Sequence, residues 1–386
     1  MSVRLQLKAG EHLMKKILFL IHDLGPGGAE KVLVNLVNNM DPQKFDITVM
    51  ALFGGGVNEQ FLKPHIRYIP CFRHMIRGNS HLMKLLSPRQ LHRWLIQDKY
   101  DIEVSYLEGP SARIISGCPH PDTKLVSWIH VEQHSEAVAA KAFRSFDESA
   151  ACYQRFHQTV CVSEYVKQDF MNLYPQVGPV GVLYNTNETD QILDKMSEDV
   201  EPGIFREGEI RLCGVGKLMP IKGFDRILRI HKRLRDEGYP VHTYLLGDGS
   251  ERSMLEAYVK DNQLSDNVTM LGYQTNPYKY VSRCDLFLCA STAEGFSTAA
   301  TEALIVGTPV CTVDVSGMKE MLGENNEYGI VTENHEDALY LAVRDLLAHP
   351  ANLGIYKTRA ALRGQAFCTK TTVNAVESML QTVKEK

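Results

Sequence analysis

The chain has 386 residues, a hydrophobic fraction of 44% and a formal net charge of −4 at pH 7. This length exceeds one typical core and favours two domains of about 180 residues, while the slightly acidic balance provides no general attraction to nucleic acid. The nine cysteines are scattered without a Cys-x-x-Cys pair. Neither a disulfide framework nor a structural zinc site is therefore indicated, and a reducing cytosol fits best.

The first residues precede a predicted strand. Residues 1–13 come before an apolar run that begins near Met14, and we expect them to be an unstructured extension or the result of an upstream start. The sequence contains no secretory signal and no apolar stretch long enough to cross a bilayer. We therefore expect a cytoplasmic protein.

Apolar runs alternate with helical patterns along the whole chain. Candidate strands in the first half are 17–22, 47–53, 102–107, 125–130, 159–162 and 181–184. After a polar stretch from 194 to 209, further candidates follow at 211–215, 242–246, 268–271, 285–289, 309–313 and 329–331. Several are apolar on both faces, which is typical of parallel strands covered by helices. The sequence thus predicts an α/β protein with doubly wound domains over 1–195 and 205–369, and a final helix over 370–386.

Two glycine-rich turns follow predicted strands. In the first half, residues 25–30 (Gly-Pro-Gly-Gly-Ala-Glu) open a helix, so their backbone N–H groups can face a cleft. In the second half, residues 214–225 turn through glycine into a helix and carry Lys217 and Lys222. Glycines let the backbone approach a ligand closely, and lysines supply mobile charges for phosphate oxygens. The second turn suits a diphosphate, although solvated lysines are also common at ordinary turns.

The most informative segment is 293–304 (Ala-Glu-Gly-Phe-Ser-Thr-Ala-Ala-Thr-Glu-Ala-Leu), which follows a predicted buried strand. It places Glu294 before a helix and Glu302 just inside it. Carboxylates there can bind sugar hydroxyls, and the N–H groups of a helix start attract phosphate. The pattern therefore suits a nucleotide sugar. The simpler interpretation is a solvated loop acid and an early helical Glu that favours the helix dipole.

In this order, the motifs resemble those of the retaining glycosyltransferases of family 4, of the bacterial polysaccharide type, over nearly the whole chain. The residues that carry the resemblance are Gly27-Gly28-Ala29-Glu30, Trp128-Ile129-His130, Val162-Ser163-Glu164, Tyr184-Asn185, Gly216-Lys217-Leu218, Lys222-Gly223, Gly247-Asp248-Gly249, Glu294-Gly295-Phe296 and Glu302-Ala303. The resemblance implies a GT-B fold, in which two Rossmann-like domains face a central cleft and the last helix braces the first domain. Two departures are Lys217, where the family often has Arg, and Asn-Thr-Asn-Glu at 185–188 in place of Asn-Gly-Ile-Asp.

The resemblance also implies the roles of individual residues. The implied donor-binding residues are Gly27, Gly28, Lys217, Lys222, Tyr273, Glu294, Gly295, Phe296, Ser297 and Glu302. Glu294 is expected near the donor sugar, Glu302 on the ribose and Tyr273 beside the base. Lys217 and Lys222 are the candidates for stabilising charge on the leaving phosphates, and the resemblance places His130 where it touches donor or acceptor. Glu294, Lys222 and His130 are thus the predicted catalytic residues, although a lone His at a strand end is often only structural.

The implied activity is transfer of a hexose-type sugar, with retention, from a nucleotide sugar such as a UDP-sugar. The implied acceptor is a glycan or lipid-linked glycan of cell-surface polysaccharide synthesis. The sequence contains no Asp-x-Asp motif, so neither a metal nor another cofactor is expected. Front-side transfer, in which the departing phosphate helps to take the acceptor proton, is what the resemblance implies.

Other functions remain as alternatives. A dinucleotide-dependent oxidoreductase would need an acid after the second strand for the ribose, where this chain has Phe-Gly-Gly-Gly at 53–56. A non-catalytic partner subunit of the same fold often lacks the charged donor residues, which this chain retains. A nucleotide-sugar epimerase of the same architecture is the nearest enzymatic alternative, because only the fate of the sugar distinguishes it.

A basic stretch predicts a membrane contact. No acid lies between Glu59 and Asp98, whereas basic residues are interleaved there with apolar ones. The basic residues are Lys63, Arg67, Arg73, Arg77, Lys84, Arg89 and Arg93. Such a segment, here 63–95, can rest on an anionic membrane surface, which suits a peripheral enzyme at the inner face of the membrane. The alternative is a solvated helix that packs on its own domain. Nucleic acid is disfavoured because aromatic platforms are sparse.

Overall fold

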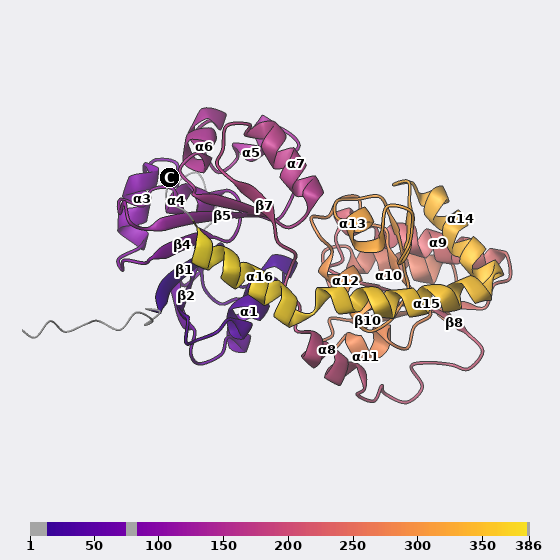
Figure 1. Cartoon of the computed structure of the whole chain (residues 1–386). Coiled ribbons are helices and arrows are strands. Elements are labelled where there is room, and N and C mark those ends of the chain that lie inside the picture. Colours follow the sequence, from indigo (N-terminus) through magenta and orange to yellow (C-terminus); the bar gives the residue numbers. More distant parts are fainter. Residues whose placement is uncertain (1–13, 75–82, 384–386) are drawn as a thin grey trace, which may run out of the picture.

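The computed structural model describes residues 14–74 and 83–383, which form two domains around two parallel sheets (Figure 1). The first sheet has seven strands in the order β3-β2-β1-β4-β5-β6-β7, and the second has six in the order β10-β9-β8-β11-β12-β13. Helices cover the sheets, and central strands are buried on both faces; β9, for example, is buried at every position. This architecture confirms the predicted pair of doubly wound, Rossmann-like domains.

The first domain is built from short parallel strands and the helices between them. Its strands are β1 (Lys15–Ile21), β2 (Phe45–Phe53), β3 (Arg67–Phe72), β4 (Ile102–Ser105), β5 (Lys124–Ile129), β6 (Gln158–Cys161) and β7 (Val180–Val182). Its helices are α1 (Gly28–Asn39), η1 (Glu59–Phe61), α3 (Pro88–Leu95), α4 (Pro110–Ile115), α5 (Glu136–Ala139), α6 (Phe146–Tyr153) and α7 (Glu164–Leu173).

The second domain repeats this alternation. Its strands are β8 (Ile210–Val215), β9 (Val241–Leu246), β10 (Val268–Gly272), β11 (Leu286–Cys289), β12 (Val310–Val313) and β13 (Ile330–Thr332). The helices that accompany it are α8 (Thr189–Met196), η2 (Pro220–Lys222), α9 (Phe224–Asp236), α10 (Arg252–Asp261), α11 (Tyr278–Val281), α12 (Thr298–Ile305), α13 (Met318–Leu322), α14 (Glu336–Ala348), α15 (Pro350–Gly364) and η3 (Gln365–Phe367).

Both sheets reverse their strand order at one strand. In the first domain β1 lies between β2 and β4, and in the second β8 lies between β9 and β11. In open α/β sheets, ligands bind outside the carboxyl ends of strands at such a switch point. Gly27 and Gly28 follow β1, Lys217 follows β8 and Glu294 follows β11, so the topology brings the predicted motifs to the switch points.

Two segments connect the domains. Helix α8 packs against α11 and α12 of the second domain, and after α15 the chain returns as α16 (Thr369–Thr382), which packs against α1 (Figure 1). Buried Glu377 of α16 anchors this return, because its carboxylate accepts hydrogen bonds from Asp41 N at 2.7 Å and Lys44 Nζ at 3.0 Å. The domain boundaries at 195 and 205 stay a prediction, and the expected extension at 1–13 lies outside the described residues.

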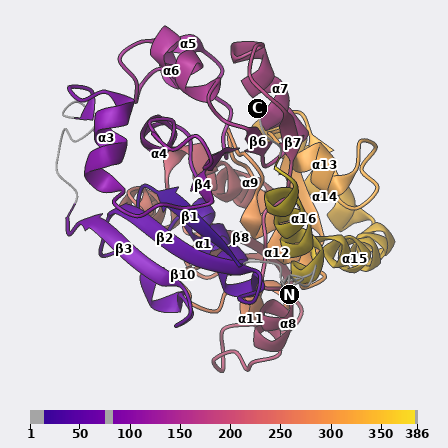
Figure 2. The same ribbon diagram turned by 60° about the vertical axis from the view of Figure 1, so that its left-hand side comes forward.

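Strand β3 was not predicted from the sequence. It occupies part of the basic stretch for which the alternative interpretation was a solvated helix, and α3 is a helix within that stretch. β3 pairs with β2 alone, as an edge strand (Figure 2). An edge strand can carry Pro70 and a charged residue such as Arg67, because one side of its backbone needs no partner strand. This composition hides the strand from a search for apolar runs.

Candidate active site

The candidate site lies where the two domains touch. Gly28, at the start of α1, faces the start of α12, and a Cβ placed on it would lie 3.4 Å from Thr298 Oγ1. Gly295 passes so close to the backbone carbonyl of His130 that a side chain would not fit. The absence of a side chain at Gly295 thus permits the close approach of the domains, whereas at Gly28 a Cβ would make an ordinary van der Waals contact.

Lys222 and Glu294 form an ion pair within the second domain. Lys222 Nζ lies 2.7 Å from Glu294 Oε1, and Ser291 Oγ donates a hydrogen bond to the same oxygen at 2.7 Å. Gly223 makes the turn that presents Lys222, since its φ is +64° and a side chain there would collide with the carbonyl of Ala290. Two predicted catalytic residues are therefore in contact. Sequence reasoning missed Ser291, although a hydroxyl three residues before Glu294 was a usable signal.

Glu302 is bonded by residues of both domains. Its Oε1 lies 2.5 Å from Lys31 Nζ of α1 and accepts a hydrogen bond from the Tyr278 hydroxyl at 3.2 Å. Lys31 also donates to the Tyr278 hydroxyl at 2.9 Å. Lys31 and Tyr278 were not predicted. The signal for Lys31 was its position, because a cation in the first turn of a helix opposes the helix dipole and needs another stabilising partner.

His130 follows β5 with its ring buried against Tyr106. Burial lowers the pKa of His130 to about 3, although a hydrogen bond to the Tyr106 backbone opposes this effect. Nε2 has no partner among the described residues. His130 is thus neutral at pH 7.

The loop between Glu294 and α12 is held by contacts of its own. Phe296 is buried, its ring stacks on Tyr184 at 5.0 Å, and its carbonyl accepts a hydrogen bond from Asn185 at 3.2 Å. Ser297 caps α12 by accepting from Ala300 N at 3.4 Å. These two predicted donor residues therefore have structural contacts through their side chains. Asn185, at the first position of the segment that departs from the family pattern, supplies part of the interdomain contact.

Two predicted donor residues lie apart from these bonded groups. Lys217, after β8, is exposed. Its positive charge acts on Glu30 of the first domain: burial raises the pKa of Glu30, and the charge of Lys217 opposes that rise. Tyr273, directly after β10, is exposed, and within the described part of the chain it forms no hydrogen bond with Glu294 or Glu302. The structure therefore does not bring Tyr273 into the group.

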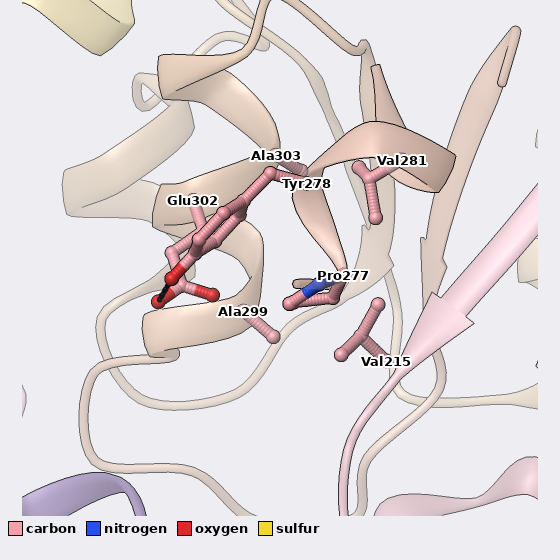
Figure 3. A pocket seen from close by; sticks show the side chains of 7 residues that line it. All are labelled: Val215, Pro277, Tyr278, Val281, Ala299, Glu302 and Ala303. Atoms are coloured by element: carbon pink, nitrogen blue, oxygen red, sulfur yellow. Dashed lines mark hydrogen bonds between the residues drawn. The ribbon is translucent and has the colours of Figure 1, made fainter. Parts of the chain in front are cut away.

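Two cavities border the site. A cavity of only about 10 Å³ lies beside the Tyr278–Glu302 hydrogen bond (Figure 3). A wider polar pocket of about 280 Å³ is lined by both domains. Its lining includes Glu132, His134 and Tyr165 of the first domain and Thr292, Asp314 and Ser316 of the second. Hydroxyl, carboxylate and imidazole groups of this kind suit the hydroxyls of a sugar.

Known families match both halves of the chain. A family model described as Glycosyltransferase Family 4 matches residues 26–191, and one described as Glycosyl transferases group 1 matches residues 196–366. The chain is 25% identical over 372 residues to the N-acetylgalactosamine-N,N'-diacetylbacillosaminyl-diphospho-undecaprenol 4-alpha-N-acetylgalactosaminyltransferase of Campylobacter jejuni. This alignment covers 92% of this chain and 96% of the relative. It is 23% identical to the lipopolysaccharide 1,6-galactosyltransferase of Escherichia coli K12, over 77% of this chain and 79% of the relative.

Solved structures share the fold. Anabaena HepE in complex with UDP and glucose has a TM-score of 0.75 at 19% identity, covering 95% of this chain and 100% of that one. A Staphylococcus aureus TarM mutant with UDP among its ligands has a TM-score of 0.73 at 14% identity, covering 96% of this chain and 100% of that one. With family matches over both domains, the protein belongs to the glycosyltransferases of the GT-B fold.

The buried neutral state of His130 predicts a pH effect on stability. An unfolded chain binds a proton on this histidine near pH 6.5, whereas the folded protein does so only near pH 3. The free energy of unfolding should therefore fall as pH drops below 6.5, by up to about 1.4 kcal/mol per pH unit from this residue. Urea unfolding from pH 7 to 5 should show a shallower decline for His130→Gln. Exposed His65→Gln is the control, and equal slopes for all three proteins would contradict the buried neutral state.

Proposed function

We propose that this glycosyltransferase moves a hexose-type sugar, with retention and without a protein-bound metal, from a UDP-sugar to a glycan or lipid-linked glycan acceptor. The observation that carries the proposal is the Lys222–Glu294 ion pair beside the interdomain contact of Gly295 with His130. The Campylobacter jejuni relative, aligned over nearly its whole length, is named for a diphospho-undecaprenol acceptor. Two structural neighbours are complexes with UDP.

Lys222 has the chemistry to stabilise the departing phosphate. Loss of a nucleoside diphosphate concentrates negative charge on the leaving oxygens, so a preorganised cation favours the transition state. An ammonium has three N–H donors, and Lys222 uses one of them on Glu294. The others remain to serve phosphate oxygens, while Glu294 keeps an oxygen for a sugar hydroxyl. Neutral His130 adds a ring nitrogen, Nε2, for a further hydroxyl.

Retention by front-side transfer is consistent with these contacts. A double displacement needs a carboxylate nucleophile at the reacting carbon. One oxygen of Glu294 is engaged by Lys222 and Ser291, and we assign its other oxygen to a sugar hydroxyl rather than to the anomeric carbon. In the front-side route the bond from the anomeric carbon to the phosphate breaks, the acceptor oxygen bonds to that carbon on the same face, and the departing phosphate takes the acceptor proton. Lys222 acts on the leaving group in this route.

The membrane-facing surface is proposed from the basic stretch. Arg73, Arg89 and Arg93 are exposed, and Leu85 and Trp94 are exposed beside them in the sequence. Positive charges with protruding apolar side chains suit the interface of an anionic bilayer at the cytoplasmic face.

The residues of the basic stretch are not equally available for contact with a membrane. Arg67 is bound to Asp98 at 2.7 Å, and Arg77 lies outside the described residues. Among the described helices, none combines the length and apolar character that crossing a membrane requires.

Removing the ion pair should abolish most transfer. Lys222→Ala and Glu294→Ala should each lower turnover by roughly 100-fold or more, comparable to loss of a preorganised transition-state group. Release of nucleoside diphosphate in a screen of UDP-sugars measures the effect. Lys232→Ala, which breaks an exposed ion pair on α9, is the matched control. Wild-type rates in both site variants, with an unchanged circular dichroism spectrum, would exclude this site.

Product stereochemistry and chelation test the route. An α-linked nucleotide sugar should give an α-linked product by NMR, and EDTA should leave most activity. Glu132, His134 and Asp169 form a possible metal group beside the polar pocket, but the Asp169 carboxylate already accepts the backbone N–H groups of Gln133 and His134. A β-linked product would refute retention, and loss of activity restored by a divalent cation would refute metal independence.

Charge removal should weaken membrane binding. Replacing Arg73, Arg89 and Arg93 together with Gln should reduce low-salt binding to phosphatidylserine vesicles roughly 100-fold, at about 1 kcal/mol per basic residue. UDP affinity should not change. The control variant replaces exposed Lys357, Arg359 and Lys370. The surface is disproved if the wild type binds anionic and neutral vesicles equally in a flotation assay.

A further inference from the structure

One ammonium group joins the two domains at the predicted ribose-binding acid. Lys31 belongs to α1 of the first domain, yet its Nζ lies 2.5 Å from Glu302 Oε1 and 2.9 Å from the Tyr278 hydroxyl, both of the second. Tyr278 also donates to Oε1. One oxygen of Glu302 therefore accepts bonds from two groups, and the lysine completes a closed triangle with them.

The two charges of this pair differ in exposure. The side chain of Glu302 is 10% exposed, whereas that of Lys31 is 39% exposed. A buried carboxylate without a partner is strongly unfavourable, but a lysine on a long flexible stem is readily solvated. If the pair separates, Lys31 can turn to water, while Glu302 needs other hydrogen-bond donors. The vicinal hydroxyls of a ribose supply donors of this kind.

The space beside the pair is too small for a nucleoside. The cavity next to Tyr278 and Glu302 measures about 10 Å³ (Figure 3), which is room for about one water molecule. Apolar side chains complete its wall: Val215, Pro277, Val281, Ala299 and Ala303. In the domain arrangement of this structure, Lys31 and Tyr278 thus engage one carboxylate oxygen of Glu302, and the cavity beside it lacks the volume that a ribose would need.

We infer that Lys31 is an internal competitor for the nucleoside half of the donor site: it occupies Glu302 when the domains meet as seen here and must leave before the ribose binds. The inference rests on the proposed nucleotide-sugar function and adds the step that controls entry to its site. Lys31 thereby couples the arrangement of the domains to donor binding, because it can reach Glu302 only from the first domain.

The first test measures nucleotide affinity. When the competent state is a minor one, apparent affinity falls by its population, so removing the competitor should raise affinity by about 10-fold. Lys31→Met should therefore bind UDP about 10-fold more tightly than wild type by calorimetry. The affinity for uridine, a probe without phosphate, should rise by a similar factor, because Lys31 competes with the ribose for Glu302. Lys31→Arg should stay near wild type, since it keeps a cation that reaches Glu302.

Controls separate competition from a general charge effect. Lys232→Met removes a lysine from an exposed ion pair on α9 and should leave both affinities unchanged. If Lys31→Met weakens UDP binding or leaves it unchanged, Lys31 is a ligand contact or a bystander, and the inference is wrong. A higher affinity of Lys31→Met for UDP without a higher affinity for uridine would also overturn the inference.

A second readout does not depend on nucleotide. Lys31→Met should increase the radius of gyration of the nucleotide-free protein in small-angle X-ray scattering, because the pair that spans the domains is lost. If no variant binds UDP but the radius still increases, the UDP-sugar proposal fails and the interdomain role of Lys31 stands. An unchanged radius, with or without UDP binding, refutes the role of Lys31 in holding the domains together.

Discussion

Two carboxylates with little solvent exposure, Glu294 and Glu302, are the constraint on which this cleft depends. Each side chain is 10% exposed, and a carboxylate at that depth requires an opposite charge or several hydrogen bonds. Glu294 obtains its cation, Lys222, from its own domain. Glu302 obtains Lys31 from the other domain. The cleft is thus held by one ion pair that is local and one that exists only where the domains meet.

This difference divides the site into two functional halves. The turn through Gly223 sets the Lys222–Glu294 pair, so the group that would stabilise the phosphates stays in place however the domains move. Glu302 takes its cation from the first domain, so under the proposed role of Lys31 the nucleoside half of the site depends on domain arrangement. Catalysis benefits from preorganised charge at the leaving group, whereas entry of a donor benefits from a site that can open.

Contacts other than the Lys31–Glu302 pair also span the domains: Asn185 Nδ2 donates to the Phe296 carbonyl at 3.2 Å, and the Tyr184 hydroxyl donates to Glu320 at 3.2 Å. α16 anchors the chain end to the first domain through Glu377, while α8 packs on the second. α3, which carries exposed Arg93 and Trp94, lies on the side of the first domain away from the second (Figure 1). A membrane contact there would leave the second domain free to move and the cleft open to a lipid-linked acceptor.

The sequence by itself determined the parallel strands and the presence of the donor motifs. Strands such as β9 are buried on both faces, so they are recognised in the sequence as apolar runs. Edge strand β3 contains Pro70 and charged residues, so it does not form such a run. Lys222 and Glu294 were predicted as members of one site from their motifs and the family resemblance, and the structure places both after strands of the second sheet. Only the tertiary structure decided which lysine neutralises Glu302. Lys31 lies 271 residues away in the chain, and no local pattern encodes a contact that forms when two separately built domains meet.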